Sequence, residues 1–410
     1  MAYLGKMFIA GSELHDGLYK CGISYALAHA SPISHTMSLR QDDWQVEFLL
    51  SSKCVVARTV CALSFEELQS IGFAIIQEAL DLLSVKGIFS TTLSEPETSS
   101  IGVYQKEEHS VLFVYELCNF PIALRCKVTQ TDASGNEIKR PLLPEPKWNE
   151  SFRYFRLSQS SNDLFEAYRN MFLAFEALLN FVCPKEKKEG EALWLKRSLS
   201  IVNGVTSLDC FAPKDSLDAI QYIIDTQYRD VRCKLQHAKF PDAQLPHAST
   251  SPLHVRQAYS ELVRIWRYIA DVYLNVRSNG GVVMYSGFSL IMDNGFGQGV
   301  KVYFTSDSFP LPDEEITISP NNAHIHEFEC SEYLGNVQPG VVRVLANEKI
   351  ALNSKKYSLP IRRIDVVSLN RPASSGYIEM GLIISGVTSW EYINDFRLIN
   401  SAQPKAIFNT

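Results

Sequence analysis

Residues 163–182 read DLFEAYRNMFLAFEALLNFV, and this stretch decides the predicted fold. Its apolar residues recur every three or four positions, which is the spacing of one face of an α-helix. That face consists of Leu164, Tyr168, Phe172, Phe175, Leu178, Leu179 and Val182. Pro184 ends the pattern, because proline lacks the amide hydrogen that a helix interior needs. So wide an apolar face must be buried against other elements.

Three further helices are expected after this one. They cover residues 189–202, 214–239 and 251–280. The last is the clearest, because Ser251 can cap its start, Pro252 suits its first turn and Gly280 follows its end. The connections are short, which favours antiparallel packing of neighbouring helices. The sequence therefore predicts an up-and-down bundle of four helices.

The regions on either side of these helices have strand character. Apolar and polar residues alternate there, as in half-buried strands. The predicted strands include residues 44–48, 111–115, 300–304 and 377–384. One amphipathic helix is expected from Ser64 to Leu83, because Ser64 and Glu67 have the spacing of a capping box.

The predicted fold class is therefore α+β, with three domains. Residues 1–150 form a strand-rich α+β domain, residues 151–280 form the helical bundle, and residues 281–410 form a β-rich domain. A turn and linker are expected at 132–148, which contains a Gly-Asn pair and three prolines. Turns are also expected at 293–295 and in the glycine-rich stretch 295–299.

The composition indicates a globular protein with an uneven charge distribution. The chain of 410 residues is 46% hydrophobic and 20% charged, which argues against a disordered or fibrous protein. Its net charge is -6, yet residues 151–280 carry 17 lysines and arginines against 14 aspartates and glutamates. A polyanionic partner is therefore expected to bind the middle third of the chain.

The sequence also indicates a soluble protein of the cytoplasm. Its nine cysteines are an odd number and form no C-x-x-C pair, which fits free thiols in a reducing compartment. The first residues lack the pattern of a secretion signal. No uninterrupted apolar run reaches the roughly 18 to 20 residues of a membrane-spanning helix.

The candidate site lies in the third predicted helix, which reads YRDVRCKLQHAK over residues 228–239. Arg232 and His237 form an Arg-x4-His pair there. The spacing alone is close to what chance gives in this composition. Its setting is more informative, because the pair lies in the basic third of the chain and on a helix of the predicted bundle.

This arrangement resembles the HEPN superfamily, whose members have helical bundles with an Arg-x4–6-His motif near the start of a late helix. The resemblance covers roughly residues 155–278. It implies a metal-independent endoribonuclease without a cofactor, which leaves a 2′,3′-cyclic phosphate and a 5′-hydroxyl group. It also implies a homodimer through the bundle, because the motifs of two protomers face each other in that family. A role in antiviral defence or a toxin system is expected, with RNA, including tRNA, as substrate and an antitoxin or phage-derived trigger as a further partner.

The two residue types suit this chemistry. Histidine titrates near neutral pH and can transfer the proton of a 2′-hydroxyl or leaving group, so His237 is the predicted acid or base. Arginine is permanently charged, so Arg232 is predicted to stabilise charge on the phosphoryl oxygens. On a regular helix the two side chains are about 140° apart, so one helix does not make a complete site. Glu176 is expected to be a carboxylate paired with an arginine.

Arg229, Lys234 and Lys239 are predicted to bind RNA phosphates. The alternative is a solvated basic helix face, and for Arg232 and His237 the alternative is an ordinary surface arginine and a histidine favoured by the end of a helix. Cys233 departs from the Asn, Asp or His that follows the arginine in many active HEPN proteins.

Two rival functions stay open. The first is a non-catalytic module for dimerisation or binding, with flanking domains that sense or regulate. The second is a different enzyme around His324 and His326, which share a strand face and could begin a zinc site.

Overall fold

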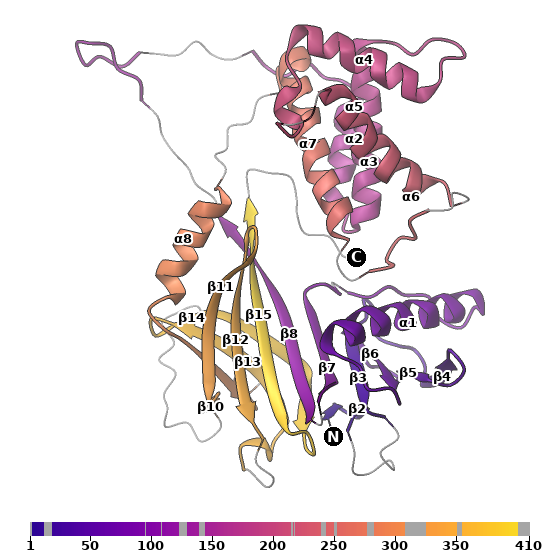
Figure 1. Cartoon of the computed structure of the whole chain (residues 1–410), viewed down its shortest axis with the longest axis vertical. Helices are drawn as coiled ribbons and strands as arrows, with labels where there is room; N and C mark the ends of the chain where they lie inside the picture. The colour runs from indigo at the N-terminus through magenta and orange to yellow at the C-terminus, as the bar shows by residue number, and fades with distance from the viewer. Residues whose placement is uncertain are drawn as a thin grey trace. The chain divides into compact units, whose positions relative to one another are not determined.

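The structure, a computed structural model, is shown in Figure 1. It describes residues 2–11, 19–94, 96–107, 109–122, 129–138, 144–214, 216, 218–238, 243–249, 252–276, 283–307, 325–350 and 355–400. The chain divides into two compact units. Met1–Phe120 and Met284–Leu398 form the sheet unit, and Pro121–Val283 and Ile399–Thr410 form the helical unit.

The first sheet of the sheet unit has six strands in the order β10-β9-β13-β14-β1-β2. These are β1 (Ala2–Leu4), β2 (Met7–Ala10), β9 (Val300–Thr305), β10 (Ile325–Glu327), β13 (Ile361–Ser368) and β14 (Arg371–Ile384). The N-terminal β1 pairs antiparallel with β14, where Leu4 lies opposite Leu382. Main-chain hydrogen bonds therefore join the two ends of the sequence.

The second sheet has nine strands in the order β11-β12-β15-β8-β7-β3-β6-β5-β4. These are β3 (Cys21–Ala26), β4 (His35–Leu39), β5 (Trp44–Phe48), β6 (Cys54–Thr59), β7 (Ser99–Lys106), β8 (His109–Ile122), β11 (Cys330–Gln338), β12 (Val341–Lys349) and β15 (Ser389–Asn400). Early and late strands meet again in this sheet, because β8 is the neighbour of β15.

Helix α1 (Phe65–Val85) covers one face of the nine-stranded sheet. The Ser64 side chain accepts a hydrogen bond from the Glu67 amide, and the Glu67 carboxylate accepts one from the Ser64 amide, so the predicted capping box is confirmed. Phe73 and Ile76 of α1 are buried in one core with Trp44. Among the described helices, α1 alone has the length and composition to cross a membrane, but its apolar face is buried in this core, which is consistent with a soluble protein. A cytoplasmic location stays a prediction.

The helical unit is arranged around α3. Its elements are α2 (Ser151–Ser160), α3 (Leu164–Val182), α4 (Glu191–Val205), the short 3₁₀ turn η1 (Asp209–Phe211), α5 (Ala219–Ile223), the π-helix η2 (Ile224–Cys233), α6 (Lys234–Gln236) and α7 (Leu253–Leu274). Helix α3 contacts α2, α4 and α7. Its apolar face is buried as predicted, and the Trp266 indole of α7 donates a hydrogen bond to the Ala174 carbonyl at 3.2 Å.

The predicted architecture is wrong: the fold is α+β, but two large sheets dominate it, and the described residues form no central four-helix bundle. The third predicted helix, 214–239, is divided into α5, η2 and α6. The first of these elements, α5, begins at Ala219 rather than at residue 214, because the Asp218 carboxylate caps the amides of Ile220 and Gln221. The 3.6-residue period of the sequence does not reveal the wider turn of a π-helix. In addition, α2 packs on α3 as a helix that the sequence analysis did not predict.

The described strands of the regions on either side of the helices share two sheets. Alternation of apolar and polar residues indicates a strand, but it does not identify the strand's partner. The turn expected at residues 293–295 is wrong as well. These residues lie in α8 (Tyr285–Phe296), where Phe288 and Phe296 are buried.

The capping box of α1 makes a stability prediction. Replacing Ser64 by alanine removes a capping hydrogen bond and should lower the free energy of unfolding by about 1 kcal/mol. Urea unfolding followed by circular dichroism measures this change. Ser70 is exposed in the same helix, so Ser70→Ala is the matched control and should leave stability unchanged or slightly raised. Equal losses in the two variants would contradict the assigned cap.

Candidate functional site

Arg232 lies between two glutamates that come from different helices. It projects from η2, and its Nη2 atom is 2.8 Å from Oε1 of Glu191 and 3.6 Å from Oε1 of Glu176. Glu176 belongs to α3, and Glu191 is the first residue of α4. The side chains of Arg232, Glu176 and Glu191 are 14%, 20% and 24% exposed. These three residues form what we call the Arg232 cluster.

Two aromatic rings flank the guanidinium group of Arg232. Its Cζ atom lies 5.7 Å from the ring centre of Phe172 and 5.4 Å from that of Tyr228. A ring face attracts a cation at this range. The Tyr228 hydroxyl also donates to Oε2 of Glu191 at 3.5 Å. These contacts fix the position of the arginine between the glutamates.

The two carboxyl groups of the cluster favour different protonation states. Burial, together with the adjacent Glu191 carboxylate, raises the pKa of Glu176 to about 8. The charge of Arg232 lowers this pKa, but by less. Burial also acts on Glu191, but the hydrogen bond with Glu176 and the charge of Arg232 outweigh it and lower the pKa of Glu191. Near neutral pH the pair therefore holds one proton, on Glu176.

Two buried polar atoms of the cluster have no hydrogen-bond partner among the described residues. They are Oε1 of Glu176 and Nε of Arg232. Buried polar groups are rarely left unpaired, because desolvation without a new hydrogen bond costs free energy. One donor and one acceptor thus remain available at the same place for a ligand or a water molecule.

The backbone under Arg232 is unusual. A π-helix of ten residues is rare, and π-helical turns are often found at functional sites. The Tyr168 hydroxyl donates to the Gln227 carbonyl at 2.6 Å, and the Gln227 side chain donates to Glu261 at 2.8 Å. Side chains of α3 and α7 therefore support the π-helix from which Arg232 projects.

The other residues predicted from the sequence lie along or beyond the same segment. Arg229 is exposed and pairs with Asp225 at 2.7 Å, and Lys234 lies 3.5 Å from Asp230. His237 directly follows α6, is half-buried, and its amide donates to the Cys233 carbonyl at 3.1 Å. Lys239 lies outside the described residues. The structure thus brings Arg232 together with Glu176, as the sequence analysis expected for Glu176.

The sequence analysis missed Glu191 and Tyr228 as members of this site. Glu191 follows Gly190 at the start of α4, where an acidic residue is common because it stabilises the helix dipole. Because this role at a helix start explains an acidic residue by itself, the sequence did not indicate that Glu191 contacts Arg232. Tyr228 lies one turn before Arg232, so a search for aromatic residues beside the arginine would have found it.

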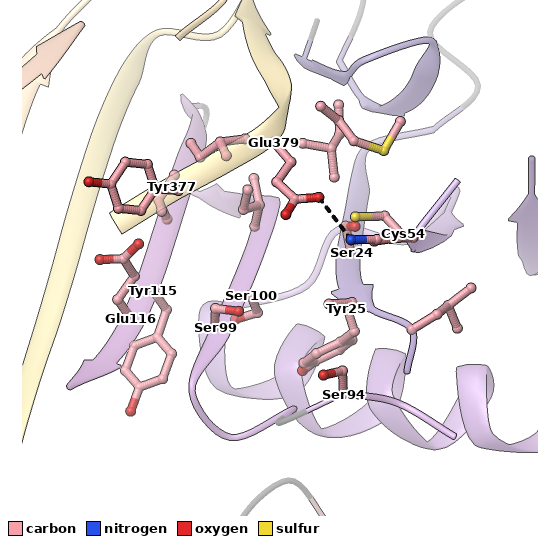
Figure 2. A pocket seen from close by; sticks show the side chains of 18 of the residues that line it. Ser24, Tyr25, Cys54, Ser94, Ser99, Ser100, Tyr115, Glu116, Tyr377 and Glu379 are labelled. Carbon is pink, nitrogen blue, oxygen red and sulfur yellow. Dashed lines mark hydrogen bonds and ion pairs between the residues drawn. The ribbon is translucent and has the colours of Figure 1, made fainter. Parts of the chain in front are cut away.

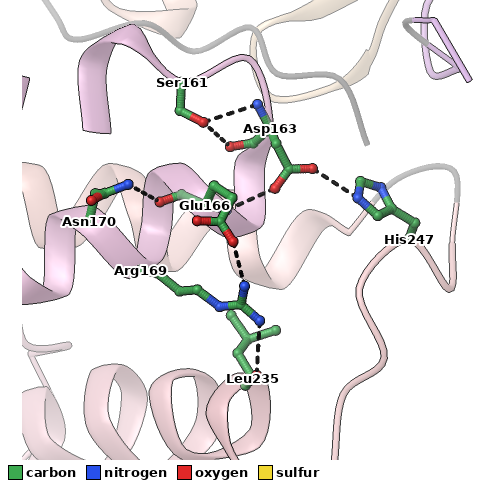
Figure 3. A network of polar contacts seen from close by, with 7 residues as sticks. All are labelled: Ser161, Asp163, Glu166, Arg169, Asn170, Leu235 and His247. Atoms are coloured by element: carbon green, nitrogen blue, oxygen red, sulfur yellow. Dashed lines mark hydrogen bonds and ion pairs between the residues drawn. The ribbon is translucent and has the colours of Figure 1, made fainter. Parts of the chain in front are cut away.

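Figure 3 shows a second polar network, at the N-terminal end of α3. The Asp163 carboxylate accepts a hydrogen bond from the Glu166 amide at 2.8 Å and lies 2.9 Å from Nε2 of His247. Arg169, which pairs with Glu166, donates to the Leu235 carbonyl at 3.3 Å. The network therefore joins α3 to α6 and to the loop after it, and it holds the segment that contains Arg232 against the helix that contains Glu176.

The histidine pair of the rival zinc hypothesis is only partly described. His324 lies outside the described residues, and the His326 ring lies 5.3 Å from that of Phe304. In the described part of the chain, no group of three His, Cys, Asp or Glu side chains has the geometry to hold a metal ion.

Comparison of the chain with protein families, with curated proteins and with solved structures finds no match. The resemblance to the HEPN superfamily is therefore wrong as a family assignment. No family model supports it, and sheets of six and nine strands, rather than a helical bundle, dominate the fold. The short Arg-x4-His spacing was too weak a signal to define a family.

The raised pKa of Glu176 makes a prediction about stability. Between the ordinary carboxyl pKa and about 8, the folded protein binds more protons than the unfolded chain, so stability falls as pH rises through this interval. Glu176→Gln stays neutral and should remove this decline. Its stability relative to wild type should increase by on the order of 1–3 kcal/mol between about pH 5 and pH 9.

Urea unfolding across this pH range measures the effect. Glu145 is an exposed glutamate of the same unit, and Glu145→Gln is the matched control with a wild-type pH profile. If the Glu176→Gln profile also matched wild type, the assignment of the proton to Glu176 would be wrong.

Proposed function

We propose that the Arg232 cluster cleaves RNA without a metal ion, by attack of a 2′-hydroxyl group on the adjacent phosphorus. One observation carries this proposal. A protonated and an ionised carboxyl group lie side by side, next to an arginine with an unused donor. A reaction that needs an acid, a base and a cation at neutral pH matches this set.

The two glutamates would take opposite roles. Glu191 accepts the proton of the 2′-hydroxyl group as that oxygen bonds to phosphorus, and Glu176 gives its proton to the 5′-oxygen as the bond from phosphorus to that oxygen breaks. The products are a 2′,3′-cyclic phosphate and a 5′-hydroxyl group. The proton on Glu191 then passes to Glu176 through their hydrogen bond, which restores the starting state.

Arg232 would stabilise the charge that develops on the phosphoryl oxygens. Its Nη2 group is engaged by Glu191, but its Nε group has no partner among the described residues. A phosphoryl oxygen that accepts from Nε satisfies this donor and lies beside the protonated Glu176. Phe172 and Tyr228 hold the guanidinium in place, and because Nε is buried, a phosphoryl oxygen reaches it only when neighbouring side chains move.

The residues found first in the sequence would contribute to substrate binding. Arg229 is exposed, and both it and Lys234 belong to the segment that carries Arg232. Contacts of Arg229, Lys234 and Lys239 with RNA phosphates stay predictions, as does proton transfer by His237. The homodimer, the antitoxin or phage-derived trigger and the role in defence also stay predictions.

A second candidate is a non-catalytic binding role for the helical unit. It is favoured by the occupied Nη2 group of Arg232, since a largely buried ion pair can serve to fix how helices pack. In that case changes to the cluster affect stability and leave RNA intact.

The ribonuclease proposal is tested with purified protein and total cellular RNA, by sequencing that selects 2′,3′-cyclic phosphate ends. Wild type should create new ends and leave DNA intact. Glu176→Gln, Glu191→Gln and Arg232→Ala should each lower the rate by about 100-fold or more. Arg153 is exposed in the same unit, so Arg153→Ala is the control and should retain activity.

The pH dependence of the cleavage rate tests whether Glu176 is the general acid. The rate should fall as pH rises through about 8, because Glu176 loses its proton there. His237→Ala separately tests the role predicted from the sequence. RNA left intact by folded wild-type protein across this pH range would reject the ribonuclease and favour the binding role.

A further inference from the structure

The sheet unit contains a cavity of about 380 Å³ between strands of its two sheets (Figure 2). Strands β3, β7 and β8 form one side, and β14 forms the other. This volume is in the range of natural sites for small molecules. The lining combines hydroxyl groups with apolar side chains, and it includes Ser24, Ser99, Tyr377, Ile101, Val114 and Met380.

Strands β3 and β7, which both line the cavity, pair over a short length. Their register covers Gly22, Ile23 and Ser24, which lie opposite Val103, Gly102 and Ile101. Beyond this point β3 turns to a different partner, since Leu27 bridges to Leu93. Tyr25 and Ser100 are the next residues of the two strands beyond the Ser24–Ile101 pair, and both are among the residues that line the cavity.

Two buried oxygen atoms of these lining residues are unpaired. The Tyr25 hydroxyl and the Ser100 hydroxyl have no hydrogen-bond partner among the described residues, and both residues are at most 3% exposed. Both side chains lie on the face of the sheet that packs against α1, where Tyr25 contacts Phe73, so they do not face Glu116 across the cavity.

Glu116 places a carboxyl group on the same wall, and Figure 2 shows it near Tyr377. It accepts a hydrogen bond from the Tyr392 hydroxyl at 2.5 Å, and no cationic side chain of the described residues pairs with it. Burial raises the pKa of Glu116 to about 7, and Asp365 contributes to the shift. A carboxyl group buried without a cation is costly to ionise, so a bound cation would stabilise it.

The surroundings of Glu116 are arranged to keep it in place. Asn394 donates to the Tyr392 hydroxyl at 2.8 Å and to the Ser374 hydroxyl at 2.7 Å, so Tyr392 is held as a donor toward the carboxyl group. Gly376 of β14 lies directly against Glu116, and a methyl group at position 376 would overlap the carboxyl oxygens. The glycine thus provides the space that the carboxyl group occupies.

The nearby lysine does not neutralise Glu116. Lys53 lines the cavity, but its Nζ atom lies 3.4 Å from Oε2 of Glu379, and both side chains are mostly exposed. The buried part of the cavity therefore presents a carboxyl group and hydroxyl groups, with apolar side chains between them. An anionic ligand would be repelled there, whereas a cationic ligand would gain a partner.

We propose that this cavity binds a small organic cation, an amine whose ammonium group pairs with Glu116 and whose apolar body packs between β14 and the nine-stranded sheet. The hydroxyls of Ser99 and Ser24, which share this face of the sheet with Glu116, would bind a polar group of the amine. The inference concerns the sheet unit and does not depend on RNA cleavage.

The test uses the full chain and isothermal titration calorimetry with matched probes. Tyramine, its neutral alcohol tyrosol and anionic hydroxyphenylacetate share one ring body and differ in charge, and phenethylamine and butylamine vary the body. At least one amine should bind saturably, and tyramine should bind at least about tenfold more tightly than tyrosol or hydroxyphenylacetate. The affinity for the amine should rise as pH passes upward through about 7, because Glu116 becomes ionised.

Two variants assign the binding to Glu116. Glu116→Gln keeps the shape of the side chain and should reduce amine affinity to that of tyrosol, whereas Glu332→Gln, at an exposed glutamate of β11, should bind as wild type. Circular dichroism verifies that each variant is folded. The proposal is overturned if none of the three amines binds saturably, if tyrosol binds as tightly as tyramine, or if folded Glu116→Gln keeps the preference for the amine.

Discussion

Main-chain pairing between strands from opposite ends of the sequence is the constraint on which the sheet unit depends. Strand β1 pairs with β14, and β8 is the neighbour of β15. Closing so long a chain segment costs entropy, but that cost rises only slowly with length, and many ladder hydrogen bonds and buried side chains offset it. The same pairing brings Tyr392 to Glu116, 276 positions earlier in the sequence, and Gly376 against its carboxyl group. Both β1 and β14 contribute residues to the cavity lining, among them Leu4 and Met380.

Both candidate sites hold partly buried carboxyl groups, but they balance the charge differently. In the helical unit, Glu176 and Glu191 share Arg232, and one proton distinguishes the two acids. In the sheet unit, Glu116 has a tyrosine donor and no cation among the described residues. The first site has the composition of an acid and base pair, and the second has that of a receptor for positive charge. Each depends on residues that local sequence reasoning treats as ordinary: Glu191 as a first-turn acid, and Gly376 as a strand glycine.

The sequence predicted the elements better than their arrangement. Helices α1 and α3 begin where Ser64 and Asp163 cap them, and β5 covers the predicted residues, because capping and periodicity act over a few residues. The single helix predicted over 214–239 was wrong, because its middle part is a π-helix that is hydrogen-bonded by the Tyr168 hydroxyl of a different helix. The HEPN assignment failed for a related reason. The distance in sequence between Arg232 and His237 does not indicate which other elements pack against their segment.

Local sequence by itself determined where the capped helices start, which strands have one buried face, and that Arg232 lies in the most basic third of the chain. Only the tertiary structure decided that the flanking regions share their sheets, that Glu176 and Glu191 meet at Arg232, and that Glu116 lines a cavity. The physical reason is that propensity, capping and hydrophobic period depend on neighbours within about one or two turns. Strand partners, shared protons and unpaired buried atoms depend on residues that are distant in sequence and close in space.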